Sequence, residues 1–216
     1  MLSLGLLEST ETIESVRHNL STNFSEGIVC TKFQAASFSH IETAIWKAIL
    51  FMHSASPLQH FIIRHPLDEN TIFVRLKYAI PNCKVKVESA LILKRQQVGP
   101  RTVRMILRSI ANDEADPFEP DSFVCDHCAW FHIEEMDDAS YLYKSFVRGN
   151  FSGFKPDDVM NLSSMFDGIV LENPWKKTPI PKDSITISTT LFESTFQTFQ
   201  TTLLSELAKQ NIQVRD

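Results

Sequence analysis

A long stretch of alternating apolar and polar residues, from Val85 to Ile110, constrains the fold of this chain more than any other part of it. A period of two is typical of strands that bury one face and expose the other. The turn at Gln97–Pro100 contains a glycine and a proline, which favour reversal of the chain. The stretch therefore predicts a long antiparallel hairpin. Its inward apolar positions are Val85, Val87, Leu91, Leu93, Val103, Met105 and Leu107.

Shorter strand patterns lie on both sides of this hairpin in the sequence. Each is a run of alternating, β-branched or aromatic residues bounded by turn residues, as is typical of strands. The predicted strands are Gly27–Phe38, Phe61–Ile63, Thr71–Ile80, Phe123–Glu134 and Ala139–Phe151. Together with the hairpin they predict an antiparallel sheet.

Two helices are expected beside the sheet. Ser39 and Glu42 form a capping box, and apolar residues at helical spacing then predict a helix at about His40–His53. The last helix begins at Thr190 or one or two turns earlier. It carries an apolar stripe about 30 Å long over about 20 residues. The stripe consists of Phe192, Phe196, Phe199, Leu203 and Leu207.

Successive strands closed by a C-terminal helix indicate an α+β fold. Weaker patterns suggest helices at residues 9–20 and 155–167, and residues 173–182 form a proline-rich loop. We therefore expect a helical N-terminal extension over residues 1–24 and the main domain over residues 25–212.

The composition favours a large apolar interior. Phenylalanine occurs 16 times, against 3 tryptophans and 3 tyrosines, and its side chain has no polar group to satisfy. The net charge of −5 gives no electrostatic support for nucleic-acid binding. The first residues lack a basic region and an apolar run long enough for a secretion signal. We expect a cytoplasmic protein with reduced cysteines.

Five parts of the sequence carry a family resemblance: Phe38–Leu50 with Trp46, Glu88–Ser109, Asp116–Phe118, Asp126–Glu134 with Trp130, and the phenylalanine-rich last helix. Over roughly residues 28–210 the chain resembles the START domain, the lipid-transfer module of the helix-grip superfamily, and most closely the divergent START-like proteins of oomycetes. The resemblance implies a curved antiparallel sheet wrapped around the last helix, with a hydrophobic tunnel between them for one lipid or sterol. The segment corresponding to the family's second and third helices is short in this chain.

The Cys125–Cys128 motif is the strongest candidate for a metal or redox site. It supplies two cysteines, but a structural zinc site needs four ligands, and Cys30 and Cys83 are isolated in the sequence. A thioredoxin-like redox site would begin a helix, whereas this motif leads into a strand. We expect ordinary cysteines, no metal and no cofactor.

Other catalytic patterns are absent from the sequence. The acidic residues 112–121 lack the spacing and the central glycine of a calcium loop, so a solvated loop is expected. The sequence contains no nucleophile elbow, zinc-protease motif, phosphate-binding loop or dinucleotide fingerprint. We therefore expect no enzymatic activity.

Arg95 is the charged residue most relevant to a ligand. It is in register with Leu91 and Leu93, which points its side chain inward at the end of the sheet. An inward arginine needs a carboxylate or a ligand headgroup as its partner. The alternative is an arginine that extends into water from the end of the strand.

Two functions are favoured by these patterns, and a third, a helix-grip enzyme such as a cyclase, is less favoured because the sequence shows no inward acid–base pair. The first is non-enzymatic binding of a lipid, sterol or other apolar ligand in a cavity between the sheet and the last helix. The second is the same fold with a filled core, acting as a protein-interaction or regulatory module. Membrane contact is expected to be transient at most, through the loop around Trp175 and Lys176. The residues expected to line the cavity are Leu91, Leu93, Met105, Leu107, Phe131, Phe192, Phe196 and Phe199.

Overall fold

The computed structural model describes most of the chain. The described residues are 5–6, 8–19, 24–34, 37–52, 59–79, 86–120, 122–138, 140–150, 184–210 and 212–215. The helix expected at residues 155–167, the loop expected at residues 173–182 and Cys83 lie outside them.

The described residues form strands and two helices in the order expected of an α+β chain. The helices are α1 (Phe38–Met52) and α3 (Ser184–Lys209). The strands are β1 (Ile13–Asn19), β2 (Phe24–Gln34), β3 (Gln59–Asp68), β4 (Thr71–Ala79), β5 (Lys86–Gly99), β6 (Thr102–Ser109), β7 (Ser122–Val124), β8 (Asp126–Glu135), β9 (Tyr141–Asn150) and β10 (Gln213–Arg215).

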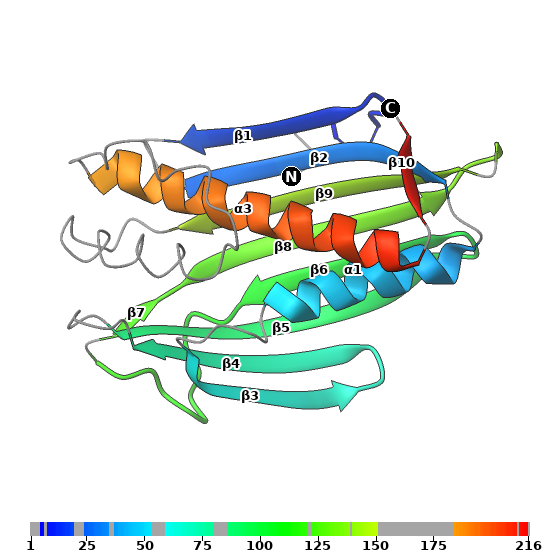
Figure 1. The fold of residues 1–216 in the computed structure, drawn as a ribbon. Helices are drawn as coiled ribbons and strands as arrows, with labels where there is room; N and C mark the ends of the chain where they lie inside the picture. Colours follow the sequence, from blue (N-terminus) through cyan, green and yellow to red (C-terminus); the bar gives the residue numbers. More distant parts are fainter. Residues whose placement is uncertain are drawn as a thin grey trace.

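All these strands join one sheet. Its order is β1-β2-β9-β8-β6-β5-β4-β3, with β10 paired to β2 and β7 paired to β5. Neighbours along this path are antiparallel, and β7 alone among the described strands pairs in parallel. Figure 1 shows α3 lying across one side of the sheet, with α1 beside it on the same side. The predicted helix-grip α+β fold is therefore confirmed.

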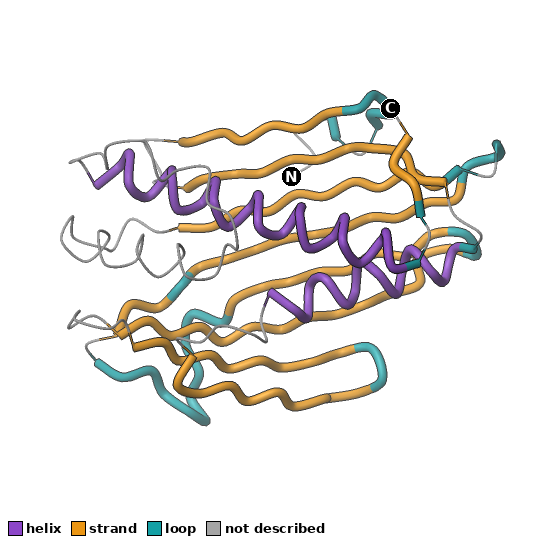
Figure 2. Tube along the Cα trace, viewed as in Figure 1, coloured by secondary structure: helices purple, strands orange, loops and turns teal. Residues whose placement is uncertain are grey.

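The sheet has two different faces, which we call the helix-facing side and the outer face. Figure 2 shows both helices on the helix-facing side of the strands. There, alternate residues of β2, β4, β5, β6, β8 and β9 pack with both helices in one apolar cluster. A smaller cluster on the outer face contains Leu6, Ile28, Trp130, Leu142 and Phe146. Both faces of the sheet therefore bury side chains.

The N-terminal segment corrects one prediction. Residues 13–19 form strand β1, not a helix, and pair with β2 from Ile13–Cys30 to Asn19–Phe24. Ile13 packs in the outer cluster and Val16 packs in the helix-facing cluster. Because both faces of β1 carry an apolar residue, their spacing of three imitated a helix. The boundary between residues 24 and 25 stays a prediction.

β1 also contacts α3. The two ring nitrogens of His18 lie 2.9 Å from the Ser25 hydroxyl and 3.1 Å from the Glu193 carboxylate. His18 therefore links the edge strand, its neighbour β2 and the polar side of the last helix.

A buried ion pair lies on the outer face, between β4 and β5. Arg75 donates to the Glu88 carboxylate at 2.7 Å, and their side chains are 0% and 1% exposed. The ring of Phe118, in the segment after β6, lies 3.9 Å from the Arg75 guanidinium carbon. Glu119 donates its backbone N–H to Glu88 at 2.8 Å. The expected solvated acidic loop is thus partly folded against the sheet.

The charge of Glu88 is stabilised by this environment. Burial by itself raises the pKa of Glu88, but the nearby Ser122 hydroxyl, the Glu119 backbone N–H and Arg75 together lower it below its ordinary value. Glu88 is therefore ionised at neutral pH, as a partner of a fully buried arginine must be.

Helix α3 approaches the sheet closely at Gly27. A Cβ atom built on Gly27 would overlap three ring carbons of Phe196. The ring of Phe196 in turn stacks on that of Phe192, with centroids 6.1 Å apart. Glycine is required at this position because the space that a side chain would fill is already occupied by α3.

We expect Gly27→Ala to lower the free energy of unfolding by about 1–3 kcal/mol, because the new methyl group overpacks the contact with Phe196. Gly99→Ala is the matched control: its Cβ would lie 3.6 Å from Thr102, in ordinary contact. Urea denaturation measures both. Equal effects of the two substitutions would contradict the close approach of α3 to β2.

We expect Glu88→Gln to cost about 3 kcal/mol at pH 7, because it leaves the buried Arg75 without its main counter-charge. The folded-state pKa of Glu88 is lowered, so its contribution is present above the unfolded pKa of about 4.3 and is lost as pH falls through the folded value. Denaturation of both proteins from pH 7 to pH 3 should show their stabilities converging. Asp137→Asn, in a solvent-exposed pair with Arg101, is the control and should change little.

Candidate functional site

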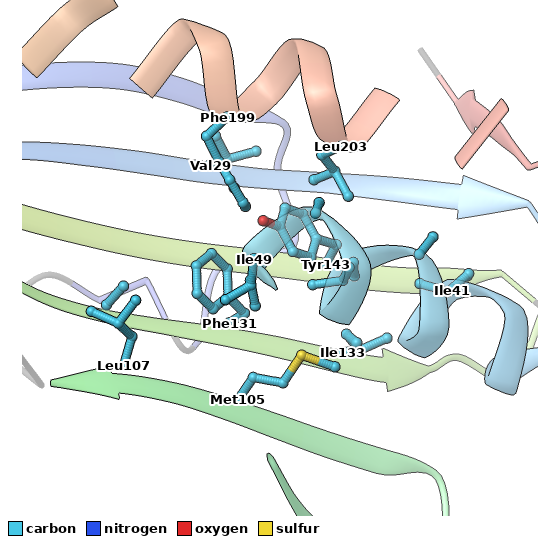
Figure 3. Close-up of a cluster of buried hydrophobic side chains, with 14 of the residues drawn as sticks. Val29, Ile41, Ile49, Met105, Leu107, Phe131, Ile133, Tyr143, Phe199 and Leu203 are labelled. Carbon is cyan, nitrogen blue, oxygen red and sulfur yellow. The ribbon is translucent and has the colours of Figure 1, made fainter. Parts of the chain in front are cut away.

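The candidate site is the apolar layer between the helix-facing side of the sheet and the two helices. All the residues expected to line a cavity belong to the buried cluster there. Figure 3 shows Met105, Leu107 and Phe131 on the strands and Phe199 on α3 pointing toward one another. The structure thus brings the expected residues into one layer, and whether a ligand enters it stays a prediction.

Strand register explains why these side chains meet. Leu93 lies opposite Leu107, which lies opposite Ala129, and Met105 lies opposite Phe131. Because neighbouring Cβ atoms in such rows are about 5 Å apart, the side chains form continuous rows across β5, β6 and β8. Phe131 then contacts Phe199 of α3, with ring centroids 5.4 Å apart.

Polar side chains also lie within this apolar layer, including two on β9. Tyr143 and Ser145 occupy alternate positions of β9, and both are fully buried. Neither the Tyr143 Oη atom nor the Ser145 Oγ atom has a hydrogen-bond partner of acceptable geometry among the described residues. Burial raises the pKa of Tyr143, an effect that the nearby Ser145 hydroxyl partly offsets. The phenol is therefore neutral at physiological pH.

Sequence reasoning missed these two hydroxyls. The sequence predicts a strand at Ala139–Phe151, but this prediction does not single out Tyr143 or Ser145. A serine at an inward position of a strand that is otherwise apolar on that side is the signal that could have revealed the site.

Arg95 has a protein partner in the structure. Its guanidinium lies 3.2 Å from the Glu42 carboxylate of α1, and its Nε atom donates to the Asn70 side chain at 3.1 Å. The Trp46 ring centroid lies 5.8 Å from the guanidinium carbon. Arg95 therefore connects α1 to β5 at the edge of the layer. The carboxylate expected as one of its two alternative partners is Glu42, and the headgroup contact stays a prediction.

The Cys125–Cys128 motif is divided between two environments. Cys125 lies between β7 and β8 and donates its backbone N–H to the Glu88 carbonyl at 3.0 Å. Burial raises the pKa of its thiol to about 12. Cys128 packs at the margin of the outer cluster, and burial raises the pKa of this thiol too. Burial lowers the pKa of His127 to about 4, with a smaller opposing effect of Asp126.

These shifts determine what the motif can do chemically. Thiolates are the nucleophilic and metal-binding form of cysteine, and raised pKa values keep both thiols protonated at neutral pH. Within the residues that the structure describes, no three His, Cys, Asp or Glu side chains come together as a metal site. In the same part of the chain, no helix has the length and hydropathy needed to cross a membrane.

Comparison with known proteins finds similarity in structure but not in sequence. No family model matches the chain, and no curated protein matches it. Human STARD10 is similar at 9% identity and a TM-score of 0.46, over 87% of this chain and 73% of that one. Human StAR-related lipid transfer protein 5 is similar at 11% identity and a TM-score of 0.45, over 89% and 81%.

An enzyme is also among the similar structures. The Zhui aromatase/cyclase from Streptomyces sp. R1128 is similar at 8% identity and a TM-score of 0.43, over 86% of this chain and 94% of that one. The architecture expected from the sequence, an antiparallel sheet with a long C-terminal helix against one side, is confirmed by the strand order and by the position of α3. The closeness to oomycete proteins stays a prediction. We argue function from this chain's own residues.

We expect the purified protein to contain no stoichiometric zinc and its melting temperature to be unchanged by a chelator, because the thiols of Cys125 and Cys128 are held protonated. Elemental analysis and thermal denaturation with and without EDTA provide the measurement. One zinc per chain, or a chelator-dependent fall in melting temperature, would contradict this account of the motif.

Proposed function

We propose that this protein binds a lipid, sterol or other apolar ligand, without transforming it, between the sheet and α3. The observation that supports the proposal is the continuous apolar layer shared by β5, β6, β8 and the phenylalanine stripe of α3. A ligand there would contact Leu91, Leu93, Met105, Leu107, Phe131, Phe192, Phe196 and Phe199. Its binding would be driven by removal of apolar surface from water, worth about 25 cal/mol per Å².

Binding without catalysis is proposed from the chemistry of the layer. General acid–base catalysis needs a group whose pKa lies near the working pH. Among the described strands, the polar side chains that reach this layer include Tyr143, Ser145 and Ser89. Their polar groups are hydroxyls. Since burial raises the pKa of Tyr143 further, its phenol is a poor proton-transfer group at pH 7.

A second candidate function is a protein-interaction or regulatory module with a filled core. The observation that favours it is close packing where α3 meets the sheet: Phe196 fills the space beside Gly27, and Phe131 contacts Phe199. Phenylalanines that fill the layer completely would leave no space for a ligand. A cytoplasmic location, no nucleic-acid partner and at most transient membrane contact remain part of both proposals.

We expect the wild-type protein to take up a fluorescent sterol or fatty-acyl probe, and Leu107→Trp to abolish that uptake. Leu107 is 6% exposed and lies opposite Leu93 and Ala129, so an indole would occupy ligand space. Probe fluorescence measures uptake and thermal denaturation measures folding. Ile106→Trp is the matched control, because Ile106 is the next residue on the same strand, on the outer face, and 40% exposed.

The filled-core alternative gives the opposite result. There the indole overpacks the core and costs about 1–3 kcal/mol or more, and the wild-type protein takes up no probe. Native mass spectrometry of the purified protein provides an independent measurement. A co-purifying lipid supports ligand binding, and its absence together with strong destabilisation by Leu107→Trp would lead us to abandon it.

A further inference from the structure

The unpaired hydroxyls of Tyr143 and Ser145 need an explanation. Both residues are 0% exposed, and neither oxygen makes a hydrogen bond of acceptable geometry to a described residue. The Ser145 hydroxyl lies close enough to Tyr143 to lower the pKa of its phenol, so the two oxygens are neighbours, and at least one of the two hydroxyl protons has no acceptor. In folded proteins the great majority of buried polar groups are paired, and an unpaired one weakens the fold. Phenylalanine and alanine would fill the same positions without leaving a hydroxyl unpaired. The two hydroxyls are therefore better explained by a partner that the described residues do not supply.

The surroundings of the two hydroxyls define what this partner can be. Tyr143 and Ser145 lie on the same side of β9, where Ser145 is flanked by Val29 of β2 and Phe131 of β8. The Tyr143 ring is held by stacking on Phe33, with centroids 5.5 Å apart. Figure 3 shows its hydroxyl oxygen directed into the apolar layer, near Val29 and Phe131. Both oxygens thus reach the same apolar region beneath α3.

We propose that Tyr143 and Ser145 hydrogen-bond one neutral oxygen atom, a hydroxyl or a carbonyl, of an otherwise apolar ligand. This inference rests on the proposed function, because it places a polar atom of the ligand within the same layer. A ligand hydroxyl can donate to one of the two oxygens and accept from the other, and a carbonyl can accept from both. The class of ligand is thus a sterol, a fatty alcohol or a ketone.

Charged lipids fit this position poorly. A carboxylate or phosphate buried without a cation is strongly disfavoured, and the side chains flanking Ser145 are Val29 and Phe131. Arg95, the cation at the edge of the layer, already pairs with Glu42. The two hydroxyls therefore select for a neutral oxygen. The competing explanation is a buried water molecule, which would satisfy them without affecting the choice of ligand.

The test compares probes that share an apolar body and differ in one oxygen. One pair is dehydroergosterol and its 3-deoxy analogue, and the other is parinaryl alcohol and the corresponding tetraene hydrocarbon, with parinaric acid as the charged member. Binding is measured by fluorescence for wild type, Tyr143→Phe and Ser145→Ala. Tyr141→Phe is the matched control, because Tyr141 lies on the same strand and the same side, packed on Phe38 at 6.0 Å.

In at least one pair, we expect wild type to bind the alcohol about three- to tenfold more tightly than the hydrocarbon, as one or two neutral hydrogen bonds would give. Tyr143→Phe and Ser145→Ala should each reduce this preference and leave hydrocarbon binding unchanged, and Tyr141→Phe should keep it. Parinaric acid should bind more weakly than the alcohol at neutral pH. In the ligand-free protein Tyr143→Phe should not lower the melting temperature, since it removes an unpaired group.

The outcomes separate this inference from the proposed function. If wild type binds alcohol and hydrocarbon equally, or if the preference survives both substitutions, the hydroxyls have no role in ligand choice and the inference is wrong, while ligand binding stands. Preference for the carboxylate would also overturn it. If wild type binds no probe of either pair, the proposed function and the inference fail together.

Discussion

The contact between α3 and the helix-facing side of the sheet is the interaction on which the rest of the structure depends. The stripe of α3 and the alternate apolar positions of the strands each present a surface that cannot remain in water. The missing side chain at Gly27 lets Phe196 approach β2 closely. The close approach brings the helix down onto the sheet, and Phe199 of the stripe contacts Phe131 of β8.

The outer face is covered by different means. Near β1 and β2 the cover is apolar, with Leu6 packed among Ile28 and Trp130. Near β4 and β5 it is electrostatic, with the segment after β6 held over Arg75 by Phe118 and by the backbone of Glu119. A buried ion pair adds little net stability compared with apolar residues, but losing one partner is costly. The pair therefore specifies where this segment lies more than it strengthens the sheet.

Long strands with apolar and aromatic alternation could be predicted from the sequence, and the short edge strand β1 could not. Strand β6 alternates cleanly, and its inward residues Val103, Met105 and Leu107 are buried. Strand β5 also buries the outer-face residues Glu88 and Ala90. The prediction of a helix in place of β1 was wrong because Ile13 and Val16 pack on opposite faces of the sheet. The partner of Arg75 depends on register between strands and on a loop that folds back, which periodicity does not contain. The unpaired state of Tyr143 likewise depends on which side chains surround it, not on its own position in β9.

Apolar burial and hydrogen bonding would contribute differently to a ligand in this layer. Burial gives affinity in proportion to area and discriminates weakly between ligands of similar size. A buried hydroxyl discriminates more strongly between ligands. A ligand that leaves it unpaired binds more weakly, because the free-energy cost of desolvating the hydroxyl is not offset by a hydrogen bond. Tyr143 is suited to this role, since β9 is paired on both sides by β2 and β8 and the ring is held by Phe33. Selectivity would then come from the rigid sheet, while the phenylalanines of α3 provide apolar area that accepts many shapes.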